Sequence, residues 1–196
     1  MDSEEDYAQI KGMPDDPHTR HRAKPSFELT VPDGDTRERS TCKSCGFIDY
    51  INPKIVAGAV VLHEGKILLC RRAIEPRMGY WTIPAGYMEL GESVEDAARR
   101  EAFEEANANI VLENLLAVYS IPRISQVQVL FKARLDDGVF SAGAESLEVA
   151  LFAFEDIPWT DLAFPSVKWV LNHYWSVRSL VTFAPFSNPS GATGDF

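Results

Sequence analysis

Cysteine and long apolar runs are both scarce in this sequence of 196 residues. Three cysteines are too few, and odd in number, for a disulfide scaffold, so we expect a reducing compartment. The start of the chain has neither a secretory nor a transit pattern, which favours the cytoplasm; a plastid or mitochondrion stays the alternative if a transit peptide is missing. The apolar run from Ile55 is far shorter than the roughly 20 residues that span a bilayer, so no membrane partner is expected.

Positive charge is also in short supply, which excludes bulk attraction to nucleic acid. Nineteen Lys and Arg face 29 Asp and Glu, and the formal net charge is -10 at pH 7. A protein with this balance repels a polyanion, so nucleic acid is not an expected partner. An anionic small molecule would need a local cation at its binding site.

Composition divides the chain into four parts. Residues 1–22 are charged, with too little apolar material to pack alone, and are expected to form a flexible arm. Residues 183–196 are rich in Pro, Ser and Gly, which predicts a flexible tail. Between them lie a short segment with a Cys-x-x-Cys pair, residues 23–53, and a β-rich domain, residues 54–182.

Strand and helix patterns alternate within the β-rich domain. Two apolar runs joined by Glu64-Gly65 predict a hairpin from Lys54 onward, and "QVQVLFKARL" and "LEVALFAF" predict two more strands. One helix is expected from about Ser93, with a capping box, to Ala106, and a second within "FPSVKWVLNHYWSVRSL". This pattern predicts the α/β class, with a mixed sheet between helices.

The first of these helices is unusually acidic. Glu101, Glu104 and Glu105 fall within about a third of its circumference, where like charges repel. A hard divalent cation, Mg²⁺ or Mn²⁺, would offset that repulsion, and a main-chain carbonyl near Gly86 could add an oxygen ligand. Arg100 lies beside this face and could hold a carboxylate in place. The alternative interpretation is a solvated acidic surface.

The spacing of these residues favours the metal site. Gly86, five residues, Glu92, seven residues and then "REAFEE" from Arg100 resemble the signature of the Nudix hydrolases. In that family the loop and helix bind divalent cations and catalyse attack of water on a nucleoside diphosphate linked to another group. Asn107 stands where the family has Gly, and we expect it to take the left-handed helix cap itself.

The likeness extends over about residues 23–180, to a subgroup with an N-terminal zinc-ribbon-like segment. It implies a Nudix-type α/β/α sandwich with a mixed β-sheet, Mg²⁺-dependent cleavage of a dinucleotide such as FAD or ADP-ribose, and a homodimer. A nucleoside-triphosphate sanitising pyrophosphatase and a non-catalytic nucleotide sensor are the alternatives.

The site residues follow from the helix and from this resemblance. The predicted catalytic residues are Glu101, Glu104, Arg100 and Glu145, with Glu101 or Glu145 as the general base. The predicted metal ligands are Gly86, Glu101, Glu104, Glu105 and Glu145. The residues predicted to bind substrate are Arg72, Arg77, Trp81, Tyr87 and Glu148. A core position for Trp81 and a structural role for Glu148 are open alternatives.

The Cys-x-x-Cys pair, Cys42 and Cys45, forms one zinc knuckle, but tetrahedral Zn²⁺ needs four ligands. Ala23 and Ser26 stand where the subgroup has its other cysteine pair, although His18 and His21 could substitute. Zn²⁺ is therefore weighed against a metal-free remnant that packs or dimerises, and the remnant is favoured.

Overall fold

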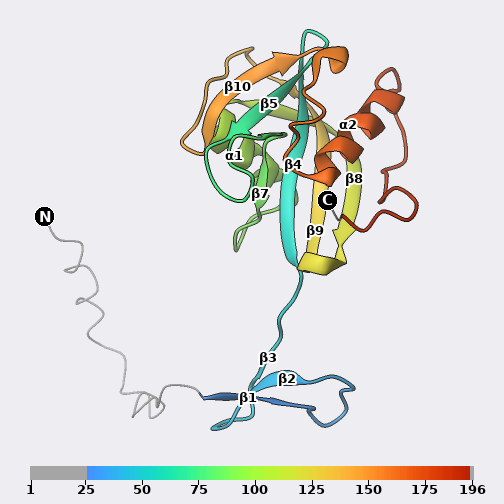
Figure 1. Ribbon diagram of the computed structural model, residues 1–196. Helices are drawn as coiled ribbons and strands as arrows, with labels where there is room; N and C mark the ends of the chain where they lie inside the picture. Colours follow the sequence, from blue (N-terminus) through green and yellow to red (C-terminus); the bar gives the residue numbers. More distant parts are fainter. Residues whose placement is uncertain (1–25, 195–196) are drawn as a thin grey trace, which may run out of the picture. The chain divides into compact units, whose positions relative to one another are not determined.

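The computed structural model describes residues 26–194, and the chain forms two compact units that divide between Ile51 and Asn52 (Figure 1). The division lies close to the predicted boundary after residue 53. The expected arm, residues 1–22, and the histidines proposed as zinc ligands lie outside the described residues. Between residues 26 and 194, no helix has the length and apolar character needed to cross a membrane.

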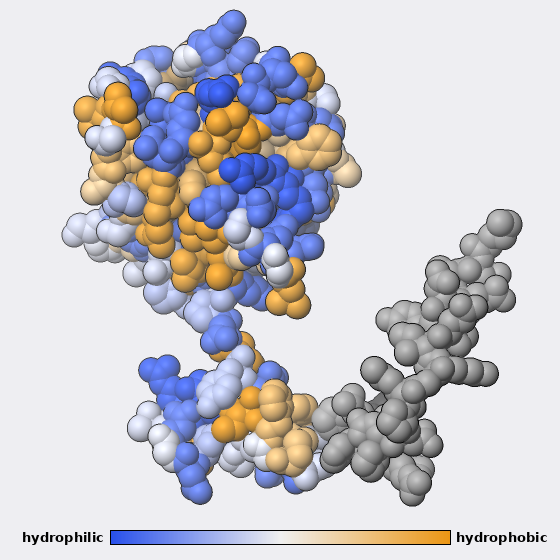
Figure 2. Space-filling view, turned by 180° about the vertical axis from the view of Figure 1, so that it is seen from behind, coloured by the Kyte–Doolittle hydropathy of each residue, from blue (hydrophilic) through white to orange (hydrophobic). Residues whose placement is uncertain are grey.

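The first unit is a small antiparallel sheet of three strands. Its strands are β1 (Phe27–Thr30), β2 (Arg39–Cys42) and β3 (Ile48–Asp49), in the order β1-β2-β3. A hydrogen bond of 2.8 Å joins the hydroxyls of Thr30 and Thr41 across the first pair. Several large apolar side chains of this unit are exposed, and apolar residues reach its surface in Figure 2: Phe27, Leu29, Phe47, Tyr50 and Ile51.

The second unit is an α/β/α sandwich, which confirms the predicted fold class. Its sheet has the order β10-β5-β4-β9-β8, with β4 parallel to β9 and the other pairs antiparallel. The strands are β4 (Lys54–His63), β5 (Lys66–Arg72), β6 (Trp81–Thr82), β7 (Ala85–Tyr87), β8 (Ile110–Ile121), β9 (Gln126–Leu135) and β10 (Ser146–Phe152). The helices are α1 (Val94–Ala106) and α2 (Pro165–Val177), and two 3-10 turns cover Pro122–Ile124 and Phe154–Asp156.

Each helix packs on its own side of this sheet. The buried alanines of α1 lie in one apolar cluster with Ala57, Ala59 and Val61 of β4. Alanine is small, so the helix backbone can lie close to the sheet, and the acidic side chains of α1 stay near it. The buried stripe of α2 lies in a second cluster with β8, and it is the stripe that helical spacing predicted: Val167, Val170, Leu171, Tyr174 and Val177.

Strands β4 and β5 stay paired only near their connecting turn. They pair at Leu62 with Ile67 and at His63 with Lys66. Further along, β4 pairs with β7 and β5 pairs with β6 instead. The sheet therefore splits between β4 and β5, and the chain from β6 to β7 lies in the opening.

The predicted turn and helix ends are confirmed. Glu64 and Gly65 both have positive φ, 48° and 78°, and so form the tight turn of the hairpin. The Ser93 side chain accepts a hydrogen bond from the Asp96 N–H at the start of α1. Asn107 caps the end of α1 in the left-handed region at φ 45° and ψ 33°.

Two parts of the second unit differ from the sequence expectation. Strand β8, the long edge strand, was not predicted, because its pairing with β9 shifts register twice and interrupts the period of two. The expected tail, residues 183–196, is in part attached to that strand. Phe186 makes two main-chain hydrogen bonds of 2.9 Å with β8, and the Asn188 amide bonds both main-chain groups of Ser120 at 2.9 and 2.7 Å. The rings of Phe183 and Phe186 pack against the core, and this packing holds the segment in place although it is rich in Pro, Ser and Gly.

Candidate active site

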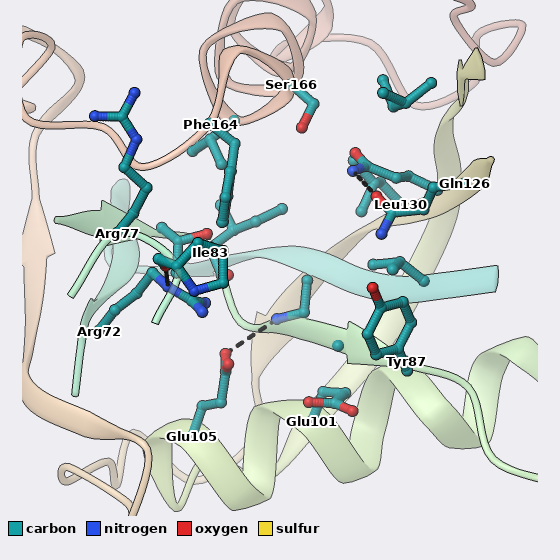
Figure 3. Close-up of a pocket in the computed structure, with 18 of the residues that line it drawn as sticks. Arg72, Arg77, Ile83, Tyr87, Glu101, Glu105, Gln126, Leu130, Phe164 and Ser166 are labelled. Carbon is teal, nitrogen blue, oxygen red and sulfur yellow. Dashed lines mark hydrogen bonds between the residues drawn. The ribbon is translucent and has the colours of Figure 1, made fainter. Parts of the chain in front are cut away.

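The acidic side chains of α1 line a cavity of about 720 Å³, a size typical of small-molecule sites. Glu101, Glu104 and Glu105 all belong to its wall, and Figure 3 shows Glu101 and Glu105 pointing from the helix toward β7. Gly86 and Glu145 line the same cavity. The residues predicted to hold a metal thus line one cavity, in which Glu101 and Glu105 are buried and Glu104 is exposed.

Arg100 links three of the nearby carboxylates. Its Nη1 donates to Glu101 Oε1 at 2.7 Å and to Glu104 Oε2 at 2.9 Å, and its Nε donates to Glu92 Oε1 at 2.6 Å. Its Nη2 also donates to the carbonyl of Tyr87 at 3.0 Å. These hydrogen bonds hold the pKa of the Glu92 carboxyl below its usual value. Arg100 therefore fixes the rotamers of the acidic residues, as predicted.

Strand β7, which faces α1, leaves room for the carboxylates of Glu101 and Glu105. A Cβ atom added at Gly86 would lie 2.5 Å from Oε1 of Glu101, so only Gly fits there while Glu101 keeps its place. The main-chain N–H of Ala85 donates to Glu105 Oε2 at 3.1 Å. Burial raises the pKa of Glu101, and it raises the pKa of Glu105 to about 8, with repulsion from Glu101 adding to the shift. Two buried carboxyl groups with raised pKa values are what a bound cation would stabilise in the charged form.

Glu145 reaches the cavity from a loop that is attached to the end of α1. The side-chain amide of Asn107 donates to the carbonyls of Ser141 and Ala142, both at 3.2 Å, and to the Ser141 hydroxyl at 3.1 Å. The N–H of Gly143 donates to the carbonyl of Glu105 at 3.0 Å. Asn107 thus does more than cap the helix, because its amide fixes the loop that carries Glu145.

Cations and aromatic rings form another wall of the cavity. Arg72 donates from Nε to the carbonyl of Pro76 at 2.9 Å, and its guanidinium lies 5.3 Å from the ring centroid of Phe164. Arg77 lies 5.1 Å from the ring of Tyr80. Both arginines line the cavity, and the positive charge of Arg72 acts on Glu105. These two cations can bind an anionic ligand despite the negative net charge of the chain.

Two residues of the predicted substrate set lie elsewhere. Trp81 is partly buried against the apolar core, edge-on to Phe152 with ring centroids 5.0 Å apart, and does not line the cavity, so the structure favours the core position that the sequence left open. Glu148 is exposed and lies 3.6 Å from Arg71, and it does not line the cavity. Tyr87 does line it. Some lining residues were not predicted from the sequence, because they lie in a strand and at a helix start that carry no recognisable motif: Gln126, Gln128, Leu130, Phe164 and Ser166.

The donor set suits a hard divalent cation such as Mg²⁺. The predicted carboxylate ligands Glu101, Glu104, Glu105 and Glu145 all line the cavity, and the space at Gly86 admits the buried carboxylate of Glu101. Within residues 26–194 no three acidic, His or Cys side chains are gathered tightly around one point, and the guanidinium of Arg100 lies between Glu101 and Glu104. The positive charge of Arg100 thus offsets the repulsion between these two carboxylates.

The first unit does not offer a complete zinc site in its described part. Cys42 is buried, Cys45 is exposed, and no other Cys or His lies between residues 26 and 51. Main-chain hydrogen bonds shape the turn around the pair, because Cys42 N–H donates to the carbonyl of Phe47 at 2.8 Å and Gly46 N–H donates to that of Cys42 at 2.9 Å. Two thiols are half of a tetrahedral set, so no chemistry is assigned to zinc.

Two family models match the chain. The NUDIX domain matches residues 52–171, and the family described as Nudix N-terminal matches residues 24–51. The two matches meet where the two compact units divide.

Individual proteins are similar over much of the chain. A NUDIX hydrolase structure from Nitrosomonas europaea has 44% sequence identity and a TM-score of 0.80, covering 85% of this chain and 94% of that one. An ADP-ribose pyrophosphatase from Methanocaldococcus jannaschii is 32% identical over 123 residues, which are 61% of this chain and 72% of that protein. A putative 8-oxo-dGTP diphosphatase from Bacillus subtilis is 37% identical over 95 residues, 48% of this chain and 60% of that protein.

Proposed function

The chain belongs to the Nudix hydrolase family, and on that basis we propose that it is a Mg²⁺-dependent pyrophosphohydrolase that cleaves dinucleotides. The proposed substrates are ADP-ribose, cleaved to AMP and ribose 5-phosphate, and FAD, cleaved to FMN and AMP. The observation that carries the proposal is the cavity of about 720 Å³, whose lining includes the glutamates predicted to hold a metal and the arginines predicted to bind substrate: Glu101, Glu104, Glu105, Glu145, Arg72 and Arg77. The similarity to an ADP-ribose pyrophosphatase supports the choice of substrate.

Each wall of the cavity has a part in the proposed reaction. Arg72 and Arg77 would grip the diphosphate by charge-assisted hydrogen bonds. Glu101, Glu104 and Glu105, with Glu145 from its loop, would hold Mg²⁺ or Mn²⁺. When bound, the metal neutralises phosphate charge and makes water a better nucleophile.

Proton transfer falls to a carboxylate of the same wall. Glu101 and Glu145 both line the cavity and could accept a proton from the attacking water. Glu101 is the better placed of the two, because Arg100 fixes one of its oxygens at 2.7 Å. The backbone around Gly86 keeps the other oxygen close to β7, where the substrate diphosphate would lie.

A substrate panel tests this proposal. Purified protein with Mg²⁺ is incubated with ADP-ribose, FAD, NADH and the nucleoside triphosphates, and products are separated by chromatography. We expect AMP with its partner monophosphate, no activity after chelation by EDTA, and a loss of about 10²-fold in Glu104→Gln.

The alternative functions give different products. Inorganic pyrophosphate released from triphosphates would support a sanitising enzyme, a candidate favoured by the similarity to a putative 8-oxo-dGTP diphosphatase. Tight binding without turnover of any compound would support a nucleotide sensor. A homodimer in the cytoplasm completes the proposal, and light scattering during gel filtration tests its oligomeric state.

A further inference from the structure

Two amide side chains on β9 face the cavity. Gln126 and Gln128 lie two residues apart, so both stand on the same side of the strand, and both line the cavity. The Nε2 atom of Gln128 donates to Oε1 of Gln126 at 2.7 Å. Figure 3 shows this bond on the side of the cavity away from Arg72 and Arg77.

Strand register places an aromatic ring beside this amide pair. Gln128 pairs with Val56 of β4, and Val56 pairs with Tyr87 of β7, so the three side chains form one row across the sheet. Residues directly opposite one another on neighbouring strands have Cβ atoms about 5 Å apart. Val56 and Tyr87 also line the cavity, which gives this region an apolar floor and a flat ring.

The bond between the two amides leaves both N–H donors and a carbonyl acceptor for a ligand. It uses one N–H of Gln128 and the carbonyl of Gln126, and within residues 26–194 no further protein bond to either side chain is found. The amide N–H groups of Gln126 and the carbonyl of Gln128 therefore remain available. If both amides were turned over, one side chain would still offer free N–H groups and the other a free carbonyl, so a ligand meets a donor beside an acceptor in either orientation.

We infer that Gln126 and Gln128 read the edge of an adenine base. Adenine presents an amino group next to a ring nitrogen, a donor beside an acceptor, and a glutamine amide is complementary to that pattern. The inference rests on the proposed function, because ADP-ribose and FAD both carry an adenosine diphosphate half. The adenine lies in the region of Tyr87, and the diphosphate lies over the glutamates of α1, toward Arg72.

The test compares adenine with hypoxanthine, in which a carbonyl replaces the amino group. The wild-type protein is expected to prefer ADP-ribose over IDP-ribose about tenfold or more in kcat/KM. Gln126→Glu is nearly isosteric and replaces the free donor by an acceptor, and Gln126→Leu with Gln128→Leu removes the amide pair. Both variants are expected to raise KM for ADP-ribose about tenfold, with little change in kcat. The double variant is also expected to bring the ratio of kcat/KM for ADP-ribose over IDP-ribose close to one.

Arg134→Gln on the same strand is the matched control, because Arg134 is exposed and does not line the cavity. Its ratio of kcat/KM for ADP-ribose over IDP-ribose should equal that of the wild type. Calorimetric titration with AMP and IMP repeats the comparison without turnover, so failure of the proposed function, an absence of cleavage, is distinguished from failure of this inference.

Two results would overturn the inference. One is equal binding of AMP and IMP by the wild-type protein. The other is an effect of the glutamine variants on FAD but not on ADP-ribose or AMP, which would assign the amide pair to the flavin instead. Thermal unfolding checks that each variant is folded. If the double variant is unfolded, the KM of Gln126→Glu for ADP-ribose still tests the inference.

Discussion

Replacing Gly86 by Ala is expected to remove most of the activity while leaving the fold intact. The new Cβ atom would lie 2.5 Å from Oε1 of Glu101, whereas ordinary contacts begin at about 3.4 Å. The obstacle is the end of a flexible side chain, so the Glu101 carboxylate moves and the strand does not. It must move by roughly 1 Å, and a displacement of that size at a catalytic group costs about 10²-fold in rate. In free energy of activation this is about 2.7 kcal/mol.

Steady-state hydrolysis of ADP-ribose and urea unfolding together measure the two effects. For Gly86→Ala we expect kcat to fall about 10²-fold and the free energy of unfolding to change by no more than about 1.5 kcal/mol, the value of the weakened bond to Arg100. Gly58→Ala is the contrasting variant, because its Cβ would lie 2.6 Å from the main-chain oxygen of Pro84. Backbone cannot rotate away, so that variant should lose about 1 to 3 kcal/mol of stability.

The reasoning about Glu101 is refuted if Gly86→Ala hydrolyses ADP-ribose within threefold of the wild-type rate. It is also refuted if Gly86→Ala unfolds as easily as Gly58→Ala, since the loss of activity would then reflect the fold. Either result would mean that the space beside Glu101 is not needed for catalysis.

Four further outcomes are expected. Asn107→Gly keeps the left-handed cap but releases the loop at Ser141, so kcat should fall about tenfold at nearly constant stability, whereas Asn107→Ala should also lose about 1 kcal/mol in urea unfolding. Arg100→Lys should lose roughly 10²-fold in kcat at saturating Mg²⁺, because an ammonium lacks the planar fork that binds several carboxylates. Burial lowers the pKa of His173 below its ordinary 6.5, so the folded chain resists protonation and the free energy of unfolding should fall as pH drops below about 6.5; His173→Phe should flatten that slope in urea titrations. Asn188→Ala loses two hydrogen bonds to β8, about 1 to 2 kcal/mol, and its C-terminal segment should be cleaved earlier in limited proteolysis.

Each of these outcomes has a result that contradicts it. Full activity in Asn107→Gly would show that the loop does not depend on the amide, and full activity in Arg100→Lys would show that charge alone suffices. An unchanged pH slope in His173→Phe, or an unchanged cleavage pattern in Asn188→Ala, would assign those properties to other residues.

The helix and its acidic face could be predicted from the sequence because their causes are local. All the determinants lie within about 15 residues of chain. They are the capping residue Ser93, the spacing of the glutamates on one helical face, and Asn107, which tolerates positive φ. The same locality explains why the pairing of Arg100 with a carboxylate could be predicted, since its partners Glu101 and Glu104 are neighbours on the helix.

The remaining wall of the cavity depends on pairing between distant strands, which no local pattern reveals. The sequence predicts β9 as a strand, but it does not reveal that Gln126 and Gln128 line a cavity. The sequence left Trp81 open between the substrate set and the core, and the pairing of β6 with β5 places its ring against Phe152. Strand β8 escaped prediction because its bulges hide the alternation.

The split between β4 and β5 has a consequence for how this protein can diversify. It lets groups from opposite sides of the sheet share one cavity, although they belong to separate segments of the chain. Mutations in β9 or at the start of α2 can therefore alter ligand preference without disturbing the glutamates of α1. Variants randomised only at Gln126, Gln128 and Ser166 could be screened for new substrates, because the glutamates of α1 stay unchanged in all of them.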